Sequence, residues 1–103
     1  MDAGKMNVGA LAIPPGARAD AESVEVLRAW IADEGLHVSL LQAFPDPETW
    51  GLLLVDVARH AARAFANEKL CAEDEALQRI RSILDAEWDA PTDVGTTEAL
   101  KPQ

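Results

Sequence analysis

The pattern of hydrophobic and polar positions predicts a β-hairpin in the first half of the chain. Two apolar runs lie within residues 24–44, and residues 33–35 between them have the composition of a tight turn in which Gly35 takes a positive φ. A competing interpretation makes 21–34 an amphipathic helix with Asp20 as its N-cap. We expect the hairpin because β-branched and aromatic residues in the first run favour a strand: Val24, Val26, Trp30 and Ile31.

The expected register of this hairpin leaves apolar side chains on both of its faces. If Ala32 lies opposite Leu36, then Trp30 pairs with Val38. One face then carries Val24, Val26, Trp30, Val38, Leu40 and Phe44, and the other carries Leu27, Ala29, Ile31 and Leu41 beside Glu25, His37 and Ser39. A two-stranded ribbon of this kind needs cover on both sides.

The second half of the chain predicts two helices. Asp46 is a good N-cap, Pro47 fits the first helical position, and the helix is expected to run to about Glu68. A second helix is expected over about 72–88, with three acidic residues in its first turn and a stop at Pro91. The fold class is therefore α+β, a hairpin followed by two helices packed on the ribbon.

The length of 103 residues allows one domain. We expect residues 1–20 to form a flexible arm, of which 10–13 could pair as a short edge strand, residues 21–89 to form the α+β domain, and residues 90–103 to form a disordered tail. A domain of this size buries only about 60% of its unfolded surface. A single cysteine, Cys71, excludes an internal disulfide, so we expect a homodimer to complete the fold, by pairing ribbon edges or stacking faces.

The charge balance excludes several kinds of partner. With 18 acidic against 9 basic residues and a net charge of −9, the chain lacks the basic surface that nucleic acids require. The apolar stretch 8–13 is too short for a signal-peptide core or a membrane span, so we expect a cytoplasmic protein with no membrane partner. The acidity also raises the hypothesis of a protein that masks a basic partner, which predicts salt-sensitive binding.

Few residues are candidates for chemistry. Asp56 and His60 stand one helical turn apart, with Arg59 beside them, and a carboxylate can prepare an imidazole as a general base. An ordinary polar pair is the alternative interpretation. Trp30, Trp50, His37 and Arg59 are the candidates for ligand binding, although tryptophans at such spacing are more often core residues. We expect no metal site and no cofactor, because histidines are few and no phosphate-binding loop is present.

Three segments resemble a family of small bacterial proteins known only as a domain of unknown function: Val24 to Leu40, Asp46 to Leu54, and Asp56-Val57-Ala58-Arg59-His60. The resemblance spans roughly residues 12 to 90 and implies a bacterial, cytoplasmic, stand-alone domain without established catalytic residues. The leading hypothesis is therefore a homodimeric binding or protein-interaction module. The alternative is a small enzyme or ligand-binding protein that uses Asp56 and His60 in a cleft.

Overall fold

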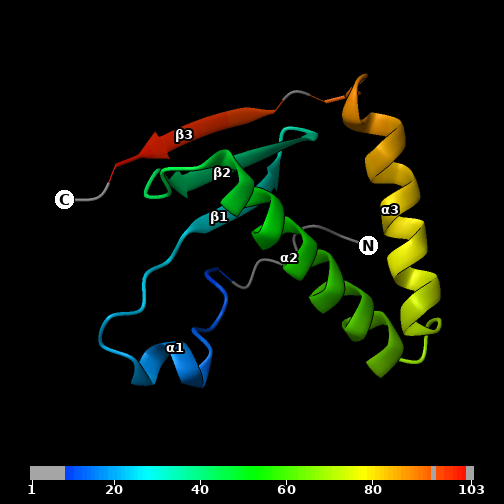
Figure 1. Ribbon diagram of the computed structural model, residues 1–103, viewed down its shortest axis with the longest axis horizontal. Helices are drawn as coiled ribbons and strands as arrows, with labels where there is room; N and C mark the ends of the chain where they lie inside the picture. The colour runs from blue at the N-terminus through cyan, green and yellow to red at the C-terminus, as the bar shows by residue number, and fades with distance from the viewer. Residues whose placement is uncertain (1–8, 94, 102–103) are drawn as a thin grey trace.

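The computed structural model describes residues 9–93 and 95–101 and confirms the α+β class (Figure 1). The hairpin is present and the helical interpretation of 21–34 is wrong, because that segment contributes the first strand. The elements are α1 (Pro15–Ala19), β1 (Leu27–Ala32), β2 (Gly35–Leu41), α2 (Pro47–Asn67), α3 (Glu73–Trp88) and β3 (Thr96–Leu100).

The hairpin register differs by one residue from the expected one. Ala32 pairs with Gly35 instead of Leu36, so that Trp30 lies opposite His37. The turn consists of Asp33 and Glu34 alone, and these two residues take the positive φ values, 52° and 61°, that we expected at Gly35. Positive φ at both central residues defines the type I′ turn, whose twist matches that of the flanking strands.

The observed register separates the apolar and polar side chains of the ribbon. A shift of one residue moves side chains to the opposite face of a strand. One face now carries Leu27, Ala29, Ile31, Leu36, Val38 and Leu40, and the other carries Arg28, Trp30, His37, Ser39 and Leu41. The predicted assignment of side chains to the two faces is therefore wrong: one face is wholly apolar, and the other carries Trp30 and Leu41 among polar residues.

Replacing Glu34 with glycine is expected to stabilise the protein by about 0.5–1 kcal/mol, because glycine adopts positive φ without the steric cost that a side chain brings. The Asp-Gly pair that results is the preferred sequence for this turn. Urea unfolding would measure the change, with Glu34→Ala as a control that removes the charge but keeps the Cβ. Equal gains in both variants would contradict the turn geometry.

The two long helices begin and end close to the predicted positions. Asp46 occupies the N-cap position of α2 with Pro47 in the first turn, although its side chain makes no capping hydrogen bond. The helix stops in a Schellman motif, in which the amide of Leu70 donates to the carbonyl of Phe65 at 3.0 Å. Lys69 takes the positive φ of 60° that this motif requires. Acidic residues fill the first turn of α3 as expected.

The segment after α3 corrects the prediction of a disordered tail over 90–103 where the structure describes it, and residues 94 and 102–103 of that range lie outside the described residues. Strand β3 pairs in parallel with β2 and completes a sheet of order β1-β2-β3. Asp93 joins the two strands, since its carboxylate accepts from the amides of Leu36 and Gly95, each at 3.0 Å. The side chain of Glu87 fixes the preceding turn by accepting from the amide and hydroxyl of Thr92, and these bonds lower the pKa of Glu87.

The N-terminal segment also differs from expectation where the structure describes it. Residues 10–13 form no strand, and α1 follows them within the segment expected to be a flexible arm. The amide of Arg18 donates to the carbonyl of Pro14, and the hydroxyl of Ser23 donates to that of Ala17. The part of the expected arm over residues 1–8 lies outside the described residues.

The helices and the sheet form separate layers that do not close on each other. In the described residues no Cα atom of α2 or α3 lies within 8 Å of a Cα atom in the three strands, so the helices do not pack as closely on the ribbon as expected. The two helices meet near their connecting turn, and their far ends diverge toward the sheet (Figure 1). Among the described residues only Ala62 and Ala76, 0% and 4% exposed, are buried.

Candidate functional site

The polar face of the sheet brings together side chains from all three strands that can form hydrogen bonds or ion pairs. The register brings Trp30 of β1, His37 of β2 and Thr96 of β3 into one row across the three strands. The next row contains Arg28, Ser39 and Glu98. Cross-strand partners project from the same face, so these six side chains share one surface.

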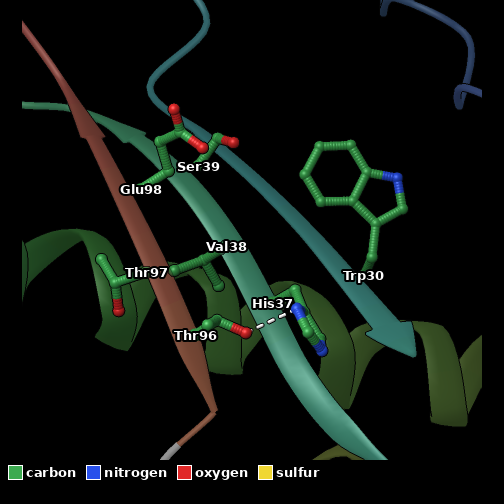
Figure 2. A pocket seen from close by; sticks show the side chains of 7 residues that line it. All are labelled: Trp30, His37, Val38, Ser39, Thr96, Thr97 and Glu98. Atoms are coloured by element: carbon green, nitrogen blue, oxygen red, sulfur yellow. Dashed lines mark hydrogen bonds between the residues drawn. The ribbon is translucent and has the colours of Figure 1, made fainter. Parts of the chain in front are cut away.

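The imidazole of His37 is fixed by hydrogen bonds at both ring nitrogens. Its Nε2 lies 3.0 Å from the carbonyl oxygen of Ala32, and a carbonyl can only accept, so Nε2 carries the proton of the neutral ring. Nδ1 then accepts from the hydroxyl of Thr96 at 2.5 Å (Figure 2). Neither nitrogen offers a lone pair to a substrate, so this histidine orders the sheet and does not act as a general base in this arrangement.

Two shallow depressions lie side by side on this face. The first has a volume of about 250 Å³, and Figure 2 shows its lining: Trp30, His37, Val38, Ser39, Thr96, Thr97 and Glu98. The second, of about 310 Å³, shares Trp30 and Ser39 with the first and extends toward Glu25, Arg28 and Leu100. Both are open to solvent, so the surface is suited to contact with another macromolecule more than to enclosing a small substrate.

The charged groups on this face are exposed. Arg28 donates from Nε to the carboxylate of Glu25 at 2.7 Å, and both side chains are at least half exposed. Such a pair contributes about 1 kcal/mol or less. Glu98 makes no ion pair with any residue in the described part of the chain. The face therefore carries mixed charge and an exposed indole, a composition found at protein interfaces.

The structure brings together two of the four residues predicted to bind a ligand. Trp30 and His37 are direct cross-strand partners. Trp50 lies apart from them at the start of α2, where its ring packs edge-on against Phe44 with centroids 5.5 Å apart. Arg59 is exposed on α2 and lines neither depression.

The predicted acid and base pair is placed on an open helix surface. Asp56 and His60 are both exposed, and neither lines the two depressions. The Nδ1 atom of His60 is 3.5 Å from a guanidinium nitrogen of Arg63, and no hydrogen bond links it to Asp56. A base exposed in this way lacks the desolvated setting that prepares it for catalysis.

Sequence reasoning placed Ser39 on the face of His37 without naming it as a site residue, and it did not identify Thr96 or Glu98. The last two belong to β3, which was not predicted, and its β-branched Thr96 and Thr97 were the one local signal for a strand. In the described ranges no group of three His, Cys, Asp or Glu side chains could hold a metal ion. Nor does any described helix combine the length and apolar character that a membrane crossing needs.

Comparisons with known proteins give a family without an assigned activity. The family model described as a domain of unknown function (DUF5076) matches residues 10–92. A solved structure from the photosynthetic bacterium Rhodopseudomonas palustrus CGA009, named provisionally as a pyruvate dehydrogenase, is 51% identical. That alignment covers 85% of this chain and 91% of the other, with a TM-score of 0.66. No curated protein matches the chain.

Proposed function

The chain belongs to the family described as a domain of unknown function (DUF5076), and from this premise we propose that it acts as a homodimeric protein-interaction module. Each copy provides half of a shared core, and the polar sheet face remains available for contact. The location proposed for it is the bacterial cytoplasm. The observation that carries the proposal is the amount of apolar surface that a single chain leaves uncovered.

A compact monomer of 11.1 kDa exposes about 5,700 Å². This chain exposes 8987 Å². Its radius of gyration is 15.5 Å, against about 13 Å for a compact domain of the same length. The excess surface is larger than one partner contributes to a standard protein interface, about 800 Å².

The uncovered surface carries large apolar side chains on the sheet and on both long helices. Ile31 is 87% exposed in the sheet, Leu52 is 70% exposed on α2, and Trp88 is 72% exposed on α3. Large apolar side chains exposed in such number are uncommon on a soluble monomer and indicate a surface used for association. A second copy of the chain is the partner that supplies matching surfaces on both layers, and closed two-fold symmetry is the commonest solution.

Sedimentation equilibrium from low to high micromolar concentration tests the proposal. We expect a dimer whose thermal unfolding midpoint rises with protein concentration, because association stabilises only the folded chain. Added salt should tighten the dimer, since two chains of net charge −9 repel each other and screening weakens that repulsion. A well-folded monomer at every concentration would overturn the proposal.

The same salt series separates this function from the masking of a basic partner. Binding between opposite charges weakens as salt is added, whereas apolar association of two acidic chains strengthens. The alternative of a small enzyme built on Asp56 and His60 is not proposed, because both side chains are exposed and make no hydrogen bond to each other. The name of the Rhodopseudomonas protein is likewise not carried over, because no residue of this chain supports it.

A further inference from the structure

β1 is an edge strand, and no other strand in the described part of the chain pairs with its outer side. The carbonyl of Val26 accepts from the amide of Leu41 at 3.0 Å, so alternate residues of the strand direct their backbone groups toward β2. The intervening residues, Leu27, Ala29 and Ile31, direct their amides and carbonyls outward from the sheet. The strand contains neither proline nor lysine, the residues that commonly protect such an edge from pairing.

We infer that the β1 strands of two copies pair antiparallel about a two-fold axis at Ala29, joining two sheets of three strands into one. The inference rests on the homodimer proposed above and specifies where the two copies meet. The outward amides of each β1 then donate hydrogen bonds to the outward carbonyls of the partner's β1, so the edges of both sheets are paired.

Side-chain chemistry selects this register among those that the open edge allows. An axis at Ala29 places Leu27 opposite the partner's Ile31 on the apolar face. On the polar face it places Arg28 opposite the partner's Trp30, where a guanidinium can stack on the indole. The high exposure of Ile31 in a single chain, 87%, is then explained by the side chain that covers it in the dimer.

The neighbouring registers are less favourable. An axis at position 28 sets two Arg28 side chains directly opposite each other, and like charges in that relation are destabilising. An axis at position 30 pairs the two Trp30 rings but sets Leu27 opposite the partner's turn residue Asp33, outside the strand. A two-fold axis nearer either end of β1 would leave fewer residues paired between the two copies. Ala29 gives the longest pairing without a charge conflict.

The two edges of the sheet offer a matched pair of proline variants. Ala29 and Ala99 are both alanines on outer strands, and both direct their amides outward, since Leu100 beside Ala99 bonds inward to Gln42. Ala29→Pro should raise the dimer dissociation constant about tenfold or more, because it removes two hydrogen bonds across the axis. Ala99→Pro should change that constant less than about threefold. Circular dichroism confirms that each variant folds.

A cysteine at position 29 tests the register directly and remains informative if the proline variant fails to fold. In a Cys71→Ser background, Ala29→Cys treated with oxidised glutathione should form a disulfide between chains while two equivalents of glutathione are released. Directly opposed residues lie about 5.5 Å apart at Cα, within the span of a disulfide. Trp30→Cys and Ala99→Cys in the same background serve as register and edge controls.

The outcomes separate this inference from the proposed function. A wild-type chain that sediments as a monomer overturns the homodimer itself. A wild-type dimer in which Ala29→Cys does not cross-link, or in which Trp30→Cys or Ala99→Cys cross-links faster, overturns the β1 pairing and leaves the homodimer intact. Rapid cross-linking at position 29 together with weakened association of Ala29→Pro supports the pairing.

Discussion

Replacing Ala62 with leucine is expected to lower the free energy of unfolding by about 2 kcal/mol, because added methylenes in a filled site force neighbouring groups apart. Ala62 is fully buried where α2 meets α3, and Ala76 is the buried residue on the other helix. A leucine there would push the two helices apart and loosen the contact between them.

Urea unfolding at a fixed protein concentration measures this effect, and Ala64→Leu is the matched control. Ala64 lies two residues away on the same helix but is exposed, so its substitution should change stability by about 0.5 kcal/mol or less. Dimer dissociation followed in parallel separates a loss of helix packing from a loss of association. Similar effects at the two positions would show that the helix crossing does not hold the fold.

Replacing Gly95 with alanine is expected to release β3 from the sheet, because the substitution should weaken the pairing of β3 with β2 by about 3 kcal/mol. Gly95 has a φ of 60°, and a Cβ built there would overlap the carbonyl oxygen of Leu36. Backbone atoms cannot move aside as a flexible side chain can. Asp93 holds both segments in place, so little adjustment is available locally.

Amide hydrogen exchange locates this effect. The amide of Gln42, which donates to the carbonyl of Leu100 at 2.6 Å, should lose protection in Gly95→Ala while the amides of α2 and α3 keep theirs. Gly51→Ala is the control, because its Cβ would meet nothing within 4 Å and alanine favours the helix by about 1 kcal/mol. Full protection of Gln42 in Gly95→Ala would contradict the observed close approach.

The parts of the fold that follow local rules were predictable from the sequence. The bounds of α2 and α3 follow from Asp46-Pro47, from the acidic start of the second helix and from the 3.6-residue spacing of apolar positions, all of which act within a few residues. The existence of the hairpin follows from its two apolar runs. None of these inferences depended on which distant segments come together.

The register and the third strand were not predictable because their causes are not local. Glycine adopts positive φ most easily, so the sequence favours Gly35 for that conformation. In the structure Asp33 and Glu34 have the positive φ values instead. Whether β3 forms depends on its pairing with β2 and on the Asp93 contact, and five exposed residues carry little pattern of their own. For the candidate site, Trp30 and His37 could be selected singly, but their pairing depended on the register.

The parallel pairing of β2 with β3 sets the order in which the sheet can assemble. Thr96 bonds to His37 across a separation of 59 residues, and both long helices lie between them. A hairpin closes in microseconds and a pair of adjacent helices needs only local contacts, whereas this loop must be closed at an entropic cost before its contacts form. During synthesis the third strand also leaves the ribosome last. The sheet therefore begins as a ribbon of two strands, and its completion waits for the helices.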